Sequence, residues 1–309
     1  MLADADPLRP ASAFIPPSCV NRLYVSDLDG TLLRNDATLS AYSRSELARL
    51  IAAGLPFTIA TARSIVSVRS ILGDLPLSLP VVCANGAYMA DLATGAHLRV
   101  FGIPKPLDEA LRRHIMDAGF HPFIMSTAGG QDRLYIGEIT NEGMEAYHAE
   151  RVREQDERLH YADDLDAVMA AEVICLNVIE RREPLARLEA GIEAAYPGRF
   201  AMYLFENWHT PEWYWLSIYD RHATKARAIE ALGQAYGYAS AQIVVFGDGY
   251  NDLSIFEMAG LAVAPANAKP EILARAHEII DTNETDSVVK YLAKATDRAE
   301  MSGTRGGEL

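Results

Sequence analysis

The chain has 309 residues, of which 50% are hydrophobic, and it is therefore long enough and apolar enough for a globular protein with two domains. Its formal net charge of -14 argues against broad contact with nucleic acid or an anionic membrane, because no basic stripe is present to neutralise phosphates. No apolar run approaches the roughly 20 residues of a membrane helix, and the first residues do not resemble a signal peptide, so we expect a cytoplasmic location.

Residues 1–20 have little apolar periodicity and are expected to form a loose N-terminal tail. From Arg22 onward, short β-branched runs alternate with amphipathic helical stretches, which is the pattern of parallel βαβ units. Ser40 is expected to cap the first helix. The elements expected in this first part are strands at 23–27, 56–61 and 80–85 and helices at 40–54 and 64–73.

The middle of the chain has an α+β composition instead. Two antiparallel strand pairs are expected, 121–126 with 133–139 and 200–206 with 213–219. The helices expected beside them are 105–119, 142–155 and 182–196.

The βαβ pattern then returns, with a helix at 223–237, a buried strand at 242–248, a helix at 251–260, a strand at 261–265 and a helix at 270–276. The chain is therefore predicted to be an α/β protein with a Rossmann-like parallel-sheet core and an inserted α+β cap domain. The expected boundaries are 21–104 and 220–295 for the core, 105–219 for the inserted domain, and 296–309 for a loose C-terminal tail.

A pair of carboxylates ends the first strand, where Asp27 and Asp29 begin the sequence D-L-D-G-T. Open α/β sheets bind ligands at the carboxyl ends of their strands. Two adjacent carboxylates repel each other unless a cation or a shared proton compensates them, and oxygen ligands of this kind suit Mg²⁺. The pattern therefore predicts a metal site.

A second acidic cluster follows the apolar strand 242–247, where Asp248 and Asp252 lie in the sequence G-D-G-Y-N-D. The glycines on either side of Asp248 permit a sharp turn. Asn251 or Asp252 could instead simply cap the following helix. Since a doubly wound sheet can place both acidic strand ends side by side, we expect the two clusters to supply oxygen ligands to one cation.

With these residues in place, the chain resembles the haloacid dehalogenase-like superfamily, and within it the Cof-type phosphatases, which carry a large inserted cap. The resemblance extends over about residues 21–295, and it implies that 21–104 and 220–295 form the catalytic core and that 105–219 form the cap that sets substrate specificity. Its four motifs are matched by DLDGTL (27–32), TAR (61–63), Lys225 and GDGYND (247–252).

The resemblance implies roles for individual residues. Asp27 would be the nucleophile and a Mg²⁺ ligand, and Asp29 would be the general acid and base, with its backbone carbonyl also on the metal. Asp248 would complete the protein ligands, and Asp252 would lie behind them. The residues implied to contact the phosphate or substrate are Leu28, Thr61, Ala62, Arg63, Lys225 and Asn251.

Two positions depart from the family pattern, because Ala62 and Ala226 stand where relatives usually have glycine. Alanine keeps the backbone N–H group, so phosphate binding survives unless the glycine was needed for a positive φ or a close approach. A third departure is the sequence VAPANA (263–268), in which Pro265 stiffens a loop that more often contains glycine.

The predicted function is that of a Mg²⁺-dependent phosphatase acting on a small phosphorylated metabolite through an aspartyl-phosphate intermediate. A sugar phosphate, a nucleotide and a cofactor phosphate are all open as substrates. The alternatives are a phosphomutase or phosphotransferase on the same scaffold, or a catalytically silent ligand-binding protein. Carbon–halogen cleavage is disfavoured, because it needs neither the acid Asp29 nor the metal ligand Asp248.

Overall fold

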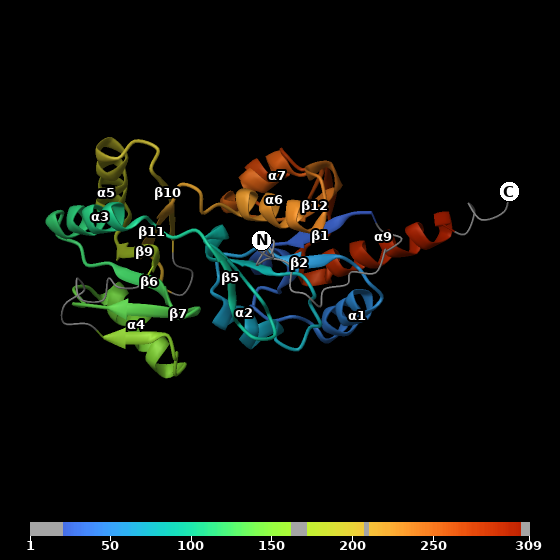
Figure 1. Cartoon of the computed structure of the whole chain (residues 1–309), viewed down its shortest axis with the longest axis horizontal. Coiled ribbons are helices and arrows are strands. Elements are labelled where there is room, and N and C mark those ends of the chain that lie inside the picture. Colours follow the sequence, from blue (N-terminus) through green and yellow to red (C-terminus); the bar gives the residue numbers. More distant parts are fainter. Residues whose placement is uncertain (1–20, 162–171, 207–209, 304–309) are drawn as a thin grey trace, which may run out of the picture. The chain divides into compact units, whose positions relative to one another are not determined.

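The computed structural model describes residues 21–161, 172–206 and 210–303. It divides into two compact units, which Figure 1 shows in sequence colours. The core unit comprises the residues up to Arg99 and from Lys225 onward, and the inserted unit comprises Val100–Thr224. In the part of the chain that is described, no helix combines the length and the apolar character that a membrane span requires.

The core unit is built on a parallel sheet of five strands, in the order β14-β13-β12-β1-β2. A single parallel bridge from Ala60 to Val82 leads from β2 to a separate three-stranded sheet, β3-β4-β5. The bounds are β1 Leu23–Ser26, β2 Phe57–Ile59, β3 Val81–Cys83, β4 Tyr88–Ala90, β5 His97–Val100, β12 Ile243–Phe246, β13 Leu261–Pro265 and β14 Glu278–Ile280.

Helices lie on both sides of the parallel sheet, with α6 and α7 on one side and α1 and α2 on the other (Figure 1). The Ser40 hydroxyl accepts a hydrogen bond from the Ser43 N–H at 2.9 Å, which confirms the predicted N-cap of α1. The helices of this unit are α1 Ala41–Ala52, α2 Ile65–Leu72, α6 Lys225–Tyr236, α7 Leu253–Met258, α8 Pro270–Leu273 and α9 Ser287–Gly303.

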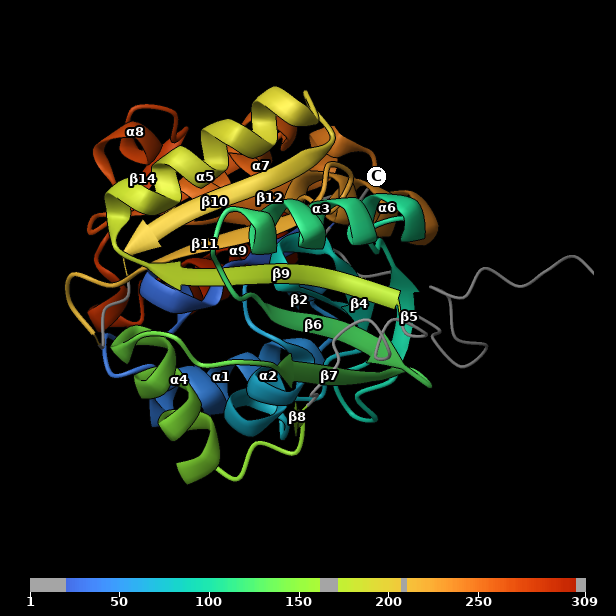
Figure 2. The ribbon, with the colours of Figure 1, turned by 90° about the vertical axis from the view of Figure 1, so that its left-hand side faces the viewer.

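The inserted unit is built on a six-stranded sheet in the order β10-β11-β9-β6-β7-β8, shown in Figure 2. All neighbours are antiparallel except β7 and β8. Its strands are β6 Phe123–Ala128, β7 Gln131–Ile136, β8 Leu159–Tyr161, β9 Glu172–Glu180, β10 Phe200–Glu206 and β11 Tyr214–Asp220, and its helices are α3 Lys105–Asp117, α4 Glu142–Arg153 and α5 Arg182–Ala195.

The hydrophobic core of the inserted unit has two parts, one on each face of this sheet. Leu111 of α3 and Leu188 of α5 pack with Leu176 of β9 in one cluster, and Met144 of α4 packs with Phe123 of β6 in the other. Because side chains of a strand alternate between faces, the sheet buries apolar groups on both sides. This is the α+β arrangement that the sequence predicted.

The α/β fold with a parallel-sheet core is confirmed, and the two predicted antiparallel pairs are present as β6–β7 and β10–β11. The sequence analysis missed β9, the strand between those pairs, and also the short strands β4, β5 and β8, and one prediction was wrong. Helix α9 continues to Gly303, although a loose tail was predicted from residue 296. Alanine, arginine and glutamate are good helix formers, so the helix extends beyond the apolar periodicity. The predicted tail at 1–20 lies outside the described residues.

One carboxylate joins three segments of the core unit. Asp286, in the left-handed conformation with φ 59°, accepts a hydrogen bond from the Ser43 hydroxyl at 3.0 Å and pairs with Arg34 at 3.4 Å. Burial raises the pKa of Asp286, but hydrogen bonds from Ser40 and Ser43 and the charge of Arg34 outweigh it and lower that pKa.

We therefore expect Asp286→Asn to lower the free energy of unfolding by about 1–2 kcal/mol at pH 7, since asparagine tolerates the same backbone but loses the charge. Because the folded-state pKa lies below the unfolded one, the contribution of Asp286 is complete above the unfolded pKa, about 3.9, and is lost as the pH falls through the folded pKa. Urea unfolding of both proteins between pH 7 and pH 3 measures this. A difference that stays constant over that range would contradict it.

Candidate active site

The site is centred on Asp27, which directly follows β1 and is buried. Its N–H donates to the Phe246 carbonyl at 2.9 Å, so Asp27 is fixed to the end of the neighbouring strand β12. The ammonium of Lys225, the first residue of α6, donates to Asp27 Oδ1 and to Asp252 Oδ1, both at 2.7 Å. The Lys225 side chain is completely buried, so it is not the solvated surface lysine that its sequence position alone would suggest.

Asp252 connects this ion pair to the acidic turn after β12. Its Oδ2 accepts hydrogen bonds from the N–H groups of Asp248, at 3.1 Å, and Gly249, at 3.0 Å. The Gly249 contact caps the short 3-10 turn Tyr250–Asp252, but the side chain makes no capping hydrogen bond to α7 and also holds Lys225, so a helix cap alone does not describe Asp252. The carboxylate instead closes the turn and holds Lys225.

Asp248 faces the loop that carries the first motif. Its Oδ1 accepts a hydrogen bond from the Thr31 hydroxyl at 2.7 Å. Gly30 has φ 72°, and a Cβ atom added to it would lie 2.4 Å from Asp248 Oδ2. Only glycine fits here, because the backbone must both adopt a positive φ and approach the carboxylate closely.

Burial and like charges shape the protonation of this cluster. Burial raises the pKa of Asp27 despite the opposing charge of Lys225, and the carboxylates of Asp252 and Asp248 raise it further. Burial raises the pKa of Asp248 to about 6. Burial alone would lower the pKa of Lys225, but the charges of Asp252 and Asp27 outweigh it and raise that pKa, so the ammonium stays charged at neutral pH.

The donor set fits a divalent cation. Carboxylate oxygens of Asp27, Asp248 and Asp252 lie within 4.8 Å of one another. Both oxygens of Asp252 already accept hydrogen bonds, whereas Asp27 and Asp248 use their Oδ1 atoms, which makes the two Oδ2 atoms the candidate ligands. Oxygen donors of this kind suit Mg²⁺, and its charge would offset the raised pKa of both carboxyl groups.

The Asp29 side chain is not part of that cluster, and its partner was not foreseen. It accepts two hydrogen bonds from the Arg63 guanidinium, at 2.7 and 2.8 Å. Such a bidentate pair of hydrogen bonds from arginine is typical of a carboxylate, because both oxygens accept. The structure therefore places a positive charge directly beside the proposed general acid and base.

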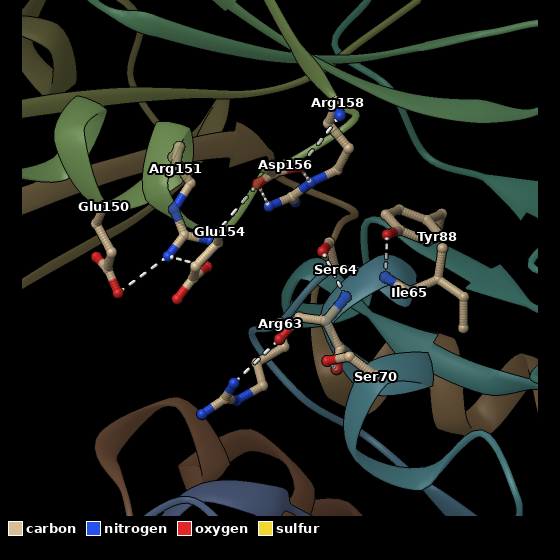
Figure 3. Close-up of polar contacts among 11 residues, drawn as sticks. Arg63, Ser64, Ile65, Ser70, Tyr88, Glu150, Arg151, Glu154, Asp156 and Arg158 are labelled. Carbon is tan, nitrogen blue, oxygen red and sulfur yellow. Dashed lines mark hydrogen bonds and ion pairs between the residues drawn. The ribbon is translucent and has the colours of Figure 1, made fainter.

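The second motif forms the turn between β2 and α2. The Thr61 hydroxyl, which is buried, accepts a hydrogen bond from the Arg63 N–H at 3.1 Å. Ser64 caps α2, and the Ile65 N–H donates to the Tyr88 hydroxyl at 2.8 Å (Figure 3). Thr61 therefore holds the turn itself, and Arg63 extends from it to Asp29.

Leu28 and Asn251 complete the residues singled out by the sequence. Leu28 is fully buried behind Asp27, and its carbonyl accepts from the Leu33 N–H at 2.8 Å, which closes the loop of the first motif. The Asn251 amide donates to Asn85 Oδ1 at 3.1 Å. The sequence reasoning assigned no role to Thr31, although it belongs to the first motif, or to Asn85, which lies outside the four motifs.

The two alanines that replace family glycines cause no backbone strain. Neither Ala62 nor Ala226 adopts a positive φ. Ala226 is the second residue of α6, where a helical backbone suits alanine better than glycine. The departures therefore leave the geometry of the motifs intact.

Comparison with known proteins places the chain in a family. Residues 24–292 match the model of the haloacid dehalogenase-like hydrolases, and the chain belongs to this family. The predicted resemblance is thereby confirmed, and with it the prediction of an enzyme of the hydrolase class.

Curated relatives in this family are phosphatases. Pyridoxal phosphate phosphatase YbhA of Escherichia coli is 25% identical over 88% of this chain and 97% of its own length. The 5-amino-6-(5-phospho-D-ribitylamino)uracil phosphatase YwtE of Bacillus subtilis is 24% identical over 86% and 95%. A solved structure from Thermotoga maritima, 24% identical, has a TM-score of 0.71 and covers 88% of this chain and 97% of its own, which supports the same fold.

Replacing Ala62 or Ala226 by glycine is expected to leave kcat/KM within about twofold, because neither backbone needs glycine. Ala226→Gly should cost up to about 1 kcal/mol in stability, since it lies in a helix. Steady-state kinetics and thermal unfolding of both variants test this. A tenfold gain in activity would show that alanine restricts the site.

Gly30→Ala is expected to displace the Asp248 carboxylate and to weaken divalent-cation binding at least tenfold, because its Cβ would overlap Asp248 Oδ2. Gly237→Ala is the matched control, since Gly237 has φ 82° in the same unit but nothing within 4 Å of its added Cβ. Both variants carry the strain of a positive φ, so the difference between them isolates the steric contact. The shift of the melting temperature with Mg²⁺ measures binding, and equal shifts in the two variants would contradict the prediction.

Proposed function

We propose that the chain is a Mg²⁺-dependent phosphatase that hydrolyses a small phosphorylated metabolite through an aspartyl-phosphate at Asp27. The observation that carries this proposal is the buried ammonium of Lys225 between Asp27 and Asp252, beside Asp248, at the carboxyl ends of two adjacent parallel strands. A small phosphate ester is also the substrate class that the names of the curated relatives state.

Asp27 acts as the nucleophile in this proposal. Its carboxylate oxygen forms a bond to phosphorus while the bond from phosphorus to the ester oxygen breaks. Lys225 holds the carboxylate through Oδ1 at 2.7 Å and lends positive charge to a group that must approach an anion. Asp27, Asp248 and the backbone carbonyl of Asp29 would hold Mg²⁺, which would supply further charge stabilisation to the phosphoryl group.

Asp29 is proposed to move the proton in both steps. It protonates the leaving ester oxygen, and it then takes a proton from the water that releases inorganic phosphate from Asp27. Its pairing with Arg63 suits the second task, which requires a carboxylate. The first task requires a protonated Asp29, so Arg63 must leave it and Asp29 must take up a proton from solvent before the ester oxygen departs; an anionic substrate offers the guanidinium a competing partner.

The surrounding residues are proposed to hold the phosphate. Thr61, Ala62 and Leu28 offer hydroxyl or backbone N–H donors, and Asn251 orients the group from the acidic turn. The inserted unit is proposed to select the leaving group, which places substrate specificity outside the motifs that carry the chemistry. The sequence motifs therefore indicate that the substrate is a phosphate ester, but they do not identify the alcohol part of that ester.

A phosphate-release screen with Mg²⁺ over pyridoxal phosphate, sugar phosphates and nucleotides tests the proposal, with Asp27→Asn and Asp29→Asn as paired variants. We expect Asp27→Asn to lose at least about 10³-fold in kcat, because the covalent bond cannot form. Asp29→Asn should still be phosphorylated by p-nitrophenyl phosphate, whose leaving group needs no acid, and should then accumulate the phosphorylated protein. Intact-protein mass spectrometry detects that species.

Full activity of Asp27→Asn on the best substrate would overturn the assignment of the nucleophile. Phosphate release that is slow in water but fast when an alcohol acceptor is added would identify a phosphotransferase instead. No turnover of any ester with Mg²⁺ would favour the silent ligand-binding alternative.

A further inference from the structure

Two asparagines outside the matched motifs hold the loop that carries Asp29. The side-chain amide of Asn267 donates from Nδ2 to the Gly30 carbonyl at 2.7 Å, and its Oδ1 accepts from the Asn283 N–H at 3.0 Å. Because one end of the amide donates and the other accepts, only one orientation of the group satisfies both partners. Asn267 therefore joins the first-motif loop to the segment after β14.

Asn283 fixes the far end of the same loop. Its side chain is buried and donates from Nδ2 to the Leu33 carbonyl at 2.9 Å and to Asn35 Oδ1 at 3.1 Å. Both amide protons are used, so the side chain spans two points of the loop. These contacts connect residues about 250 positions apart in the sequence.

The same segment also holds the second acidic motif. The Lys269 N–H, two residues beyond Asn267, donates to the Asp248 carbonyl at 2.9 Å. The loop and Asp248 are already in close contact, since Thr31 donates to Asp248 and no Cβ fits between Gly30 and its carboxylate. A small displacement of Gly30 would therefore change the spacing between Asp248 and the Asp29 peptide.

We infer that Asn267 and Asn283 are positioning residues, which fix the first-motif loop against Asp248 and so set the affinity of the site for its divalent cation. This inference rests on the proposed cation site. The segments after β13 and β14 would then contribute to the reaction by positioning the loop, although neither segment supplies a ligand or a reacting group.

The test compares Asn267→Ala and Asn283→Ala with Glu284→Ala. Glu284 accepts a hydrogen bond from the Asn35 N–H at 2.6 Å, so its removal also weakens the contact of this segment with the loop, but it makes no contact with Gly30, which Asn267 holds directly. Thermal unfolding titrated with Mg²⁺ alone reports cation affinity without substrate. Steady-state kinetics at saturating Mg²⁺ report kcat and KM separately.

We expect Asn267→Ala to weaken Mg²⁺ binding about fivefold to tenfold, as the loss of one positioning hydrogen bond predicts. The same variant should lower kcat by a larger factor than the factor by which it changes KM. Asn283→Ala should act in the same direction, and the double variant should be less affected than the product of the single effects, because the two residues act through one connection. Glu284→Ala should bind Mg²⁺ within about twofold of the wild type.

Asn267 is exposed, so Asn267→Ala should fold even if the buried Asn283→Ala does not, and it keeps the test decisive. If Asn267→Ala binds Mg²⁺ with unchanged affinity while Asp248→Asn loses that affinity, the positioning role is overturned and the cation site is supported. Unchanged affinity in Asp248→Asn would show that the cation site itself is wrong. If Asn267→Ala and Glu284→Ala weaken Mg²⁺ binding equally, the effect comes from the general stability of the loop, and the inference is also overturned.

Discussion

The interaction on which the site depends is the buried contact of the Lys225 ammonium with Asp27 and Asp252. Removing a charge from water is costly, and a buried carboxylate is tolerated only when a partner and hydrogen bonds compensate it. Here one cation offsets two carboxylates, and Asp252 uses its other oxygen to close the turn at Asp248. Removing Lys225 would leave uncompensated negative charge in the middle of the site, so the lysine stabilises the arrangement in which it is also proposed to act.

The order of the parallel sheet brings the members of this network together. Strand β1 lies directly beside β12, so Asp27 and the Asp248 turn emerge from neighbouring strand ends. Strand β2 lies on the other side of β1 and ends at the turn from which Arg63 reaches Asp29. Lys225 begins α6 as the first residue of the core unit after the insertion, so it contacts Asp27 although the whole inserted unit lies between them in the sequence.

Local patterns predicted much of this fold for identifiable reasons. The helix start at Ser40 followed from a capping side chain, and the buried strands of the core followed from their apolar runs. Strand β9 was missed because it is apolar on both faces, so it lacks the alternation that marks a half-buried strand. The extension of α9 was missed because helix propensity, rather than periodicity, continues it.

The sequence by itself determined the chemistry that is available: two acidic clusters at strand ends, a lysine at a helix start, and the hydrolase family to which they belong. Only the tertiary structure decided that Arg63 pairs with Asp29, that Lys225 is fully buried, and that Asn267 and Asn283 hold the Gly30 loop. The reason is physical. Residue types and short spacings follow from the chain itself, whereas hydrogen bonds between residues 34 to 250 positions apart depend on how the elements pack.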